Sequence, residues 1–216
     1  REIIMNPQMP QTTSDTGPAA MPAAPTEEQA RRAALYQLLA GLLRDAPGEA
    51  VLDYTRGLEA DAGGRQSELP LALSTLALAA RHSAVDSVRD EYHMLFIGLG
   101  RGELVPYGSW YQTGFLMEKP LGLLRADLRR LGFERDDDVR EPEDHIAALC
   151  EVMSLMILDG IPIENQQQFF DHHLGNWAGD FFRDLAGAES AVFYRSVARL
   201  GEAFLSLETR YLSLLD

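Results

Sequence analysis

Two short clusters in the sequence combine residue types that are suited to binding chemistry. Residues 106–111 read Pro-Tyr-Gly-Ser-Trp-Tyr and follow a glycine-rich stretch, and residues 141–145 read Glu-Pro-Glu-Asp-His. Aromatic side chains with polar tips are enriched at peptide-binding surfaces. The aromatic cluster therefore suits peptide binding, and the acidic cluster places three carboxylates and a histidine in or just before one helical turn. The alternatives are that the rings fill a core between two helical halves and that the acids only favour a helix N-terminus.

The acidic cluster also predicts the state of its histidine. Pro142 is expected to begin a helix that has Glu143 and Asp144 in its first turn, where the helix dipole stabilises carboxylates. A cation is disfavoured at this end of a helix, so His145 is expected to be neutral or paired.

The other reactive residue types do not assemble a catalytic or metal-binding pattern. The sequence has no Glu-x-x-His pair for a di-iron helical site, and the adjacent His172 and His173 are expected on different helix faces. The single cysteine, Cys150, and the scattered histidines do not supply a zinc site. Residues 98–102 contain three glycines but form neither a P-loop nor a dinucleotide fingerprint. The sequence thus predicts a protein that is not an enzyme and holds no metal or cofactor.

Net charge narrows the class of partner, and cysteine content indicates the cellular compartment. The 216 residues include 33 acidic and 19 basic side chains, a formal net charge of −14, which argues against a nucleic-acid partner and favours a basic peptide. Solubility alone is the simpler explanation of this excess. With Cys150 as the only cysteine, no intrachain disulfide can form, as is usual in a reducing cytoplasm. Neither a membrane span nor a secretory signal is recognisable, so we expect a cytoplasmic protein.

The elements that must position these clusters are expected to be helices. Apolar residues recur at helical spacing from Thr26 onward, which predicts a single all-α domain of about nine helices, and Thr26 and Gln29 form a capping box. Residues 1–25 have no such periodicity and are expected to be a flexible, disordered N-terminal tail. Residues 98–108 are the one long irregular loop in the middle, and the expected place for a hinge or swap between two halves. The last helix is expected from about 188 to 214.

Four short segments of the sequence stand out together: Glu-Tyr-His-Met-Leu-Phe-Ile-Gly at 91–98, Pro-Tyr-Gly-Ser-Trp-Tyr at 106–111, Glu-Pro-Glu-Asp-His-Ile at 141–146 and Phe-Phe-Asp-His-His-Leu-Gly-Asn-Trp at 169–177. With these segments, which occur in the order of the family, the chain resembles the TorD/DmsD/NarJ family of redox-enzyme maturation chaperones, from about Thr26 to its C-terminus. Gly108 stands where many trimethylamine-oxide-reductase chaperones of this family have Glu, which is closer to the DMSO-reductase type.

The resemblance implies an all-helical cytoplasmic chaperone. Such a chaperone binds the apo catalytic subunit of a molybdopterin oxidoreductase and its twin-arginine leader peptide, assists cofactor insertion and delays export until maturation. The alternatives are a NarJ-type assembly chaperone of a non-exported molybdoenzyme and a helical protein that weakly binds or hydrolyses GTP. Either a monomer or a domain-swapped dimer is expected. The peptide groove that the resemblance implies is lined by Tyr107, Ser109, Trp110, Tyr111, Glu141, Asp144 and His145.

Overall fold

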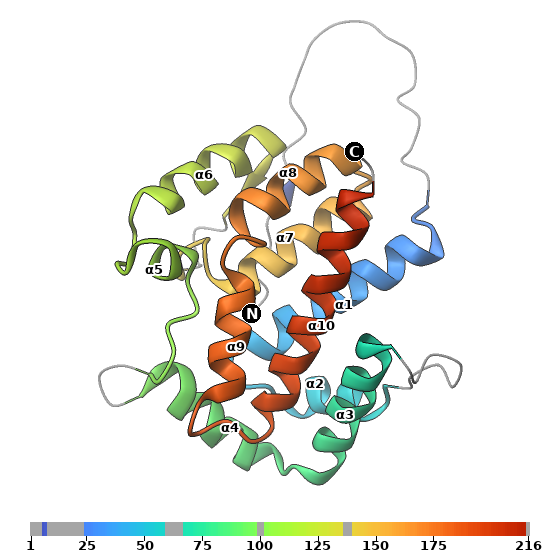
Figure 1. Cartoon of the computed structure of the whole chain (residues 1–216), viewed down its shortest axis with the longest axis vertical. Helices are drawn as coiled ribbons and strands as arrows, with labels where there is room; N and C mark the ends of the chain where they lie inside the picture. The colour runs from blue at the N-terminus through green and yellow to red at the C-terminus, as the bar shows by residue number, and fades with distance from the viewer. Residues whose placement is uncertain (1–5, 8–23, 59–66, 99–101, 136–139, 215–216) are drawn as a thin grey trace, which may run out of the picture.

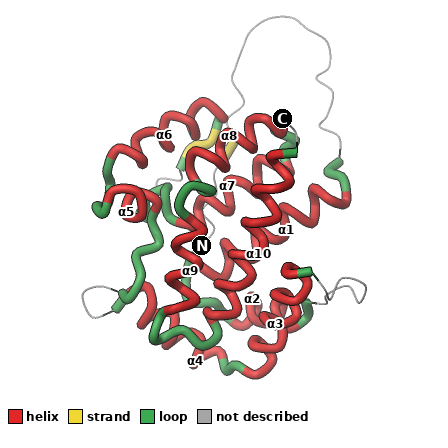
Figure 2. Tube along the Cα trace, in the orientation of Figure 1, coloured by secondary structure: helices red, strands yellow, loops and turns green. Residues whose placement is uncertain are grey.

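The described part of the chain is almost entirely helical. The computed structural model describes residues 6–7, 24–58, 67–98, 102–135 and 140–214. These residues form ten α-helices, one π-helical turn and two very short strands, so the all-α prediction is confirmed with one helix more than the nine expected (Figures 1 and 2). The helices are α1 (Glu27–Leu43), α2 (Glu49–Arg56), α3 (Glu68–His82), α4 (Val85–Tyr92), the π-helical turn η1 (His93–Ile97), α5 (Gly108–Thr113), α6 (Lys119–Leu131), α7 (Ile146–Leu158), α8 (Ile163–His173), α9 (Ala178–Gly187) and α10 (Tyr194–Ser213).

The predicted N-terminal tail, residues 1–25, lies mostly outside the described residues. Within it, β1 (Asn6–Pro7) pairs antiparallel with β2 (Phe133–Glu134), which follows α6. Residues 24–25 lead into α1. Flexibility of the tail stays a prediction.

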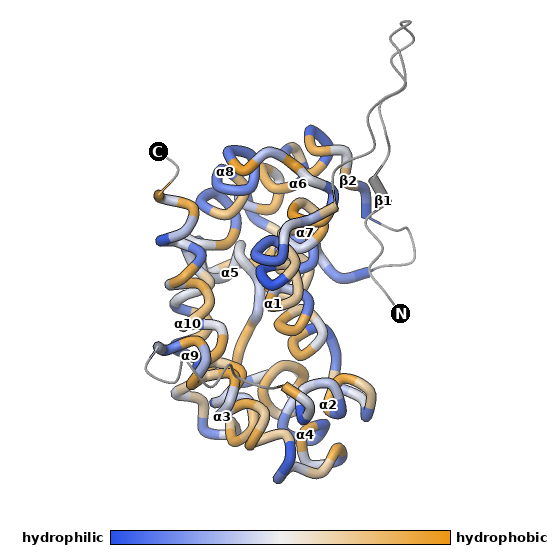
Figure 3. Tube along the Cα trace, turned by 90° about the vertical axis from the view of Figure 1, so that its right-hand side faces the viewer, coloured by the Kyte–Doolittle hydropathy of each residue, from blue (hydrophilic) through white to orange (hydrophobic). Residues whose placement is uncertain are grey.

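The helices form an elongated bundle with two ends. Helices α6 and α8 lie at one end and α2, α3 and α4 at the other, in both Figure 1 and the perpendicular view of Figure 3. Helix α1 packs against α7, and α10 packs against α9 and α3. In Figure 3 the outer helix α10 carries both hydrophobic and hydrophilic residues, as expected of a helix with one buried face.

The centre of the core is α7. Ten of its thirteen residues are buried, which is typical of a helix that is apolar on all sides and surrounded by other elements. Cys150 lies here, and burial raises the pKa of its thiol to about 12, so it behaves as a small hydrophobic residue. The predicted capping box of α1 is confirmed: Gln29 N–H donates to Thr26 Oγ1 at 3.2 Å, and Thr26 N–H donates to Gln29 Oε1 at 2.8 Å.

The segment 91–98, one of the four matching motifs, has an architectural role. The buried Glu91 carboxylate accepts three backbone N–H groups from residues 192–194, at 2.7, 3.0 and 2.7 Å. The Tyr92 hydroxyl donates to the Arg44 carbonyl at 2.9 Å. The Phe96 ring lies edge-on to Tyr194, with centroids 5.6 Å apart. This motif therefore joins the ends of α1 and α4 to the start of α10.

The last helix begins later than expected. It starts at Tyr194 rather than near residue 188, because the backbone N–H groups just before it are bound by acidic side chains from a distant segment. In addition to the Glu91 contacts, Glu103 accepts N–H groups from Glu189 at 2.5 Å and Ser190 at 3.1 Å. These bonds hold the preceding residues in a turn. None of the helices in the described ranges combines the length and the apolar character that crossing a membrane requires.

Candidate functional site

The two clusters singled out in the sequence are in direct backbone contact. Gly108 N–H donates to the Asp144 carbonyl, and Ile146 N–H donates to the Pro106 carbonyl, both at 2.9 Å. Tyr107 and His145 form an antiparallel bridge between these two bonds. The tertiary structure therefore joins the aromatic segment that begins α5 to the acidic segment that precedes α7. We refer to residues 141–145 as the acidic turn.

The predicted groove residues differ in exposure. The side chains of Tyr107, Trp110 and Tyr111 are half-buried, and Glu141 is exposed. Ser109, Asp144 and His145 are buried, with exposed fractions of 0, 3 and 7%. The seven residues lie in one region, but only the first four have side chains at the surface. Peptide binding by any of them stays a prediction.

Asp144 caps α5 from outside that helix. Its Oδ2 accepts the backbone N–H of Ser109 at 2.7 Å, which satisfies one of the free donors in the first turn of α5. The Ser109 hydroxyl oxygen in turn accepts the N–H of Met117 at 3.2 Å. The other carboxylate oxygen of Asp144, Oδ1, is buried and has no hydrogen-bond partner among the described residues. A buried carboxylate oxygen of this kind is an acceptor that a guanidinium group could satisfy.

The expected start of the following helix was wrong. Helix α7 begins at Ile146, with His145 as its N-cap, and not at Pro142. Glu143 and Asp144 therefore precede the helix instead of occupying its first turn. The reason is that both carboxylates bind groups on other elements, and these bonds hold 142–145 in a turn that the His145 N–H to Pro142 O bond closes at 3.2 Å.

Glu143 links the acidic turn to α6. Arg125 of α6 donates to both carboxylate oxygens of Glu143, with Nε to Oε1 at 3.1 Å and Nη2 to Oε2 at 2.9 Å. Although burial opposes it, the hydrogen bonds from Arg125 lower the pKa of Glu143. A two-pronged bond of this geometry is specific for arginine. Glu143 is therefore already occupied by an arginine of the same chain.

The exposed end of the site consists of Glu141 and Tyr107. The Tyr107 hydroxyl donates to Glu141 Oε2. Burial is the main cause that raises the pKa of Tyr107, and this hydrogen bond is the second. The Tyr107 ring lies edge-on to His145, with centroids 5.0 Å apart. An exposed carboxylate beside an aromatic ring can contact a cationic side chain by ion pairing and by cation–π interaction.

Tyr111 belongs partly to the core, as one of the sequence alternatives proposed. Its ring stacks on Trp177 with centroids 5.4 Å apart, and its hydroxyl donates to Asp184 Oδ2 at 3.0 Å. Gly108 also lies against this tryptophan: a Cβ atom at Gly108 would be 3.0 Å from Trp177 Nε1. A glutamate at Gly108 would thus require the tryptophan or α5 to shift.

Apolar residues beside this site were missed by sequence reasoning. Phe115 and Met117, in the connection between α5 and α6, are 68 and 72% exposed, and Leu116 and Leu123 are about half exposed. Three consecutive apolar residues after Gly114 were the available signal. We call the three consecutive residues, Phe115, Leu116 and Met117, the apolar patch. Solvent-exposed apolar residues that cluster indicate an interaction surface.

His145 is neutral, as expected, although burial is the main cause. Burial and, to a lesser degree, Arg44 lower its pKa from 6.5 to about 4, and its Nδ1 accepts the N–H of Ala147 at 3.2 Å. Below pH 6.5 the unfolded chain binds a proton at this residue that the folded chain does not bind until about pH 4. The stabilisation present above pH 6.5 is therefore lost as the pH falls, by about 2 kcal/mol between pH 7 and pH 5. Urea unfolding at the two pH values measures this loss.

The matched variant is His145→Asn, which keeps a side-chain acceptor at the N-cap and removes the titrating ring. Its unfolding free energy should fall less between pH 7 and pH 5 than that of wild type. His173, whose pKa burial also lowers, contributes equally in both proteins. Equal losses in wild type and variant would show that His145 is not the source.

A known protein family matches the part of the chain that contains the site. The family model described as nitrate reductase delta subunit matches residues 63–183, which include α5 and the acidic turn. The chain is 26% identical over 204 residues to the chaperone protein TorD of Vibrio atlanticus, covering 85% of this chain and 95% of the relative. It is also 26% identical over 203 residues to TorD of Vibrio parahaemolyticus, covering 84 and 94%.

A solved structure shares the fold. A crystal structure from Archaeoglobus fulgidus, described as a redox enzyme maturation protein, superposes with a TM-score of 0.55 over 91% of this chain and 99% of its own, at 19% sequence identity. At that identity the likeness concerns the fold alone.

Proposed function

Because the chain belongs to the nitrate reductase delta subunit family, and the curated relatives that it matches are TorD chaperones, we propose that it is a maturation chaperone and not an enzyme. Its client would be the apo catalytic subunit of a molybdopterin oxidoreductase, which it binds in the cytoplasm together with the twin-arginine leader peptide. Binding would assist cofactor insertion and delay export until the enzyme is mature.

The observation that carries this proposal is the junction between the acidic turn and α5. It brings the exposed Glu141, from the same turn as the buried Asp144, into hydrogen-bond contact with the half-buried Tyr107. Two hydrogen bonds connect the acidic turn with the apolar patch: Ser109 N–H donates to Asp144, and the Met117 N–H donates to the Ser109 hydroxyl oxygen. A leader peptide that has two arginines next to an apolar segment matches an acidic site beside an apolar one.

Overall charge supports the same partner. A net charge of −14 attracts a basic peptide and raises the rate of encounter at low salt. Glu141 is the residue that an arginine can reach without rearrangement. A direct bond to Asp144 would require the segment around it to open, because this side chain is 3% exposed.

Calorimetry with a synthetic twin-arginine leader peptide tests the proposal. Asp144→Asn and Glu141→Gln each remove one negative charge with little change of shape, and each should weaken binding about tenfold. Glu134→Gln is the matched control, because it removes another exposed acid, from β2, and it should bind like wild type. A peptide with both arginines replaced by lysine should bind more weakly, since lysine cannot form the two-pronged bond.

Three results would contradict the proposal in different ways. If the folded Asp144→Asn and Glu141→Gln variants bind as tightly as Glu134→Gln, the peptide site lies elsewhere. If affinity falls only in proportion to the folded fraction in thermal melts, these residues serve the fold alone. If the lysine peptide binds as well as the arginine peptide, the site recognises charge and not the paired arginines of a leader; a NarJ-type assembly chaperone of a non-exported enzyme, which the description of the matching family model favours, is then the second candidate.

A further inference from the structure

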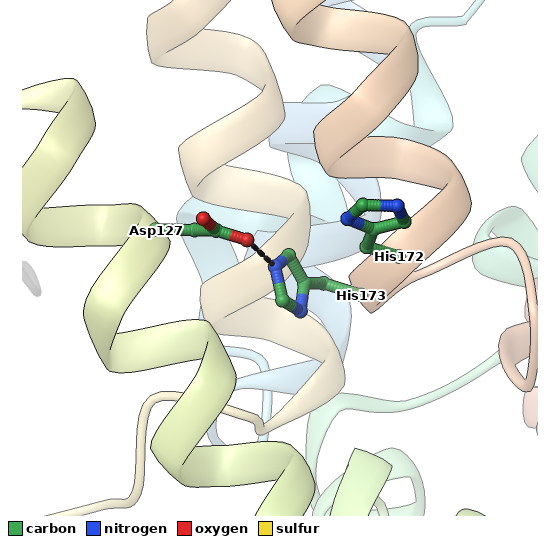
Figure 4. Close-up of side chains that lie close together, drawn as sticks. All are labelled: Asp127, His172 and His173. Atoms are coloured by element: carbon green, nitrogen blue, oxygen red, sulfur yellow. Dashed lines mark hydrogen bonds and ion pairs between the residues drawn. The ribbon is translucent and has the colours of Figure 1, made fainter.

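Outside the proposed peptide site, one group of side chains has the composition of a metal centre. Asp127 of α6 and His172 and His173 at the end of α8 offer one ligand atom each, all within 4.8 Å of one another. Figure 4 shows His173 between Asp127 and His172, with both imidazoles coming from α8 and the carboxylate from α6. The two adjacent histidines differ in exposure, His172 exposed and His173 buried, as expected of different helix faces, yet their ring nitrogens still come within reach of one another.

We propose that Asp127, His172 and His173 bind a zinc-class transition-metal ion that bridges α6 and α8. Two imidazoles and one carboxylate are the ligand set that zinc accepts, and imidazole also suits Ni²⁺ and Cu²⁺. Calcium and magnesium prefer oxygen ligands and are therefore not expected here.

The geometry requires only small side-chain movements. A tetrahedral ion with ligand distances of about 2.0–2.2 Å holds its ligand atoms roughly 3.4 Å apart. His173 Nε2 and Asp127 Oδ2 are now 2.7 Å apart and share a hydrogen bond, so they must separate slightly. The two imidazole centroids are 6.0 Å apart with perpendicular planes, and rotation of the exposed His172 can bring its nitrogen closer. The Nε2 proton of neutral His173 would move to Nδ1 when the metal binds.

The surroundings leave room for a further ligand. All three residues line an open cavity of about 690 Å³, whose wall also contains the amide side chains of Gln112, Gln168 and Asn176. With three protein ligands, a zinc site keeps a fourth position for water or for a group of a bound molecule. The amides can hold such a water by hydrogen bonds.

Two nearby cationic side chains limit the affinity of this site for a metal ion. Arg130 Nη2 lies 3.1 Å from Asp127 Oδ1, and Lys119 lines the same cavity. Both compete with a metal ion for the carboxylate or repel it. We therefore expect binding in the micromolar range and not the tight binding of a closed structural zinc site.

Titration calorimetry of the full chain without a histidine tag, using Zn²⁺ alone, tests this proposal. Wild type should bind one equivalent, and His172→Ala should bind about tenfold more weakly or not at all, since loss of even an outer-shell partner typically costs that much. His172 is exposed and has the least structural role of the three, so this variant should fold normally. His82→Ala, which removes an exposed histidine at the end of α3, is the matched control and should bind like wild type.

Thermal melts supply the second measurement. Zinc should raise the melting temperature of wild type and His82→Ala but not of His172→Ala or Asp127→Asn, because an ion that binds only the folded state stabilises it. Absence of Zn²⁺ binding to wild type, or equal binding by the His172→Ala, Asp127→Asn and His82→Ala variants, would overturn the proposal. Neither result would bear on the peptide site, which is measured separately and with a different ligand.

Discussion

Arg32→Met should lower the free energy of unfolding by about 3–5 kcal/mol, because it leaves a buried carboxylate without its counter-charge. Arg32 of α1 donates through Nε to Glu208 Oε1 at 2.8 Å and through Nη2 to Glu208 Oε2 at 2.9 Å. Tyr36 also donates to this carboxylate, at 3.1 Å. The two charged side chains are only 6 and 1% exposed, so water cannot replace the lost partner. The pair ties the first helix to the last.

Urea unfolding followed by circular dichroism measures this effect, which corresponds to a fall in melting temperature of about 10 °C for a chain of this size. The double variant Arg32→Met with Glu208→Leu should recover part of the stability, since an apolar pair of similar volume often replaces a buried ion pair without loss, but the buried Tyr36 hydroxyl loses its acceptor. A cost below about 1 kcal/mol for Arg32→Met would mean that the pair is screened like a surface ion pair.

Glu91→Ala should cost about 4 kcal/mol, the second large effect, because three backbone N–H groups at the start of α10 lose their acceptor together. The carboxylate is buried, and its bonds to residues 192–194 connect segments about a hundred positions apart in the chain. Each buried donor left without a partner typically costs 1–3 kcal/mol. Some rehydration of the turn should reduce the sum.

The measurement is again the free energy of unfolding in urea. Glu202→Ala, on the exposed face of α10, is the matched control and should change stability by less than about 0.5 kcal/mol. Equal stability of the two variants would show that the Glu91 bonds contribute nothing net. Since α10 packs on α9 and α3, a loosened α10 should also give more rapid amide exchange in those helices.

The acidic turn has more structural functions than its composition suggested. Glu141 binds Tyr107, Glu143 binds Arg125, Asp144 caps α5 and His145 caps α7. One short turn thereby attaches α5 and α6 to the central helix. Any loss of peptide binding in its variants must therefore be compared with their thermal stability, and Glu141, the most exposed of these residues, is the cleanest site for the test.

Helix content and several helix ends could be predicted because they depend on local interactions. Apolar spacing of three and four residues determines which segments can bury one face as a helix, and the Thr26–Gln29 capping box involves side chains within one turn. The sequence predicted His145 to be neutral or paired from its place at a helix N-terminus, but the main cause of its lowered pKa is burial, which the packing of the helices decided.

Contacts between distant segments were decided only by the packing of the helices. Asp127 and His173 are 46 residues apart, and Arg32 and Glu208 are 176 apart, yet each pair shares a hydrogen bond. Helical periodicity shows that a residue lies on a given face, but not which residue of another helix will meet it. The partners of Glu143 and Asp144 could not be predicted for the same reason. Their charges suited the dipole of a helix N-terminus, but in the tertiary structure Glu143 binds an arginine of α6 and Asp144 binds a backbone N–H of α5. These directed hydrogen bonds are stronger than the interaction with a helix dipole at a distance.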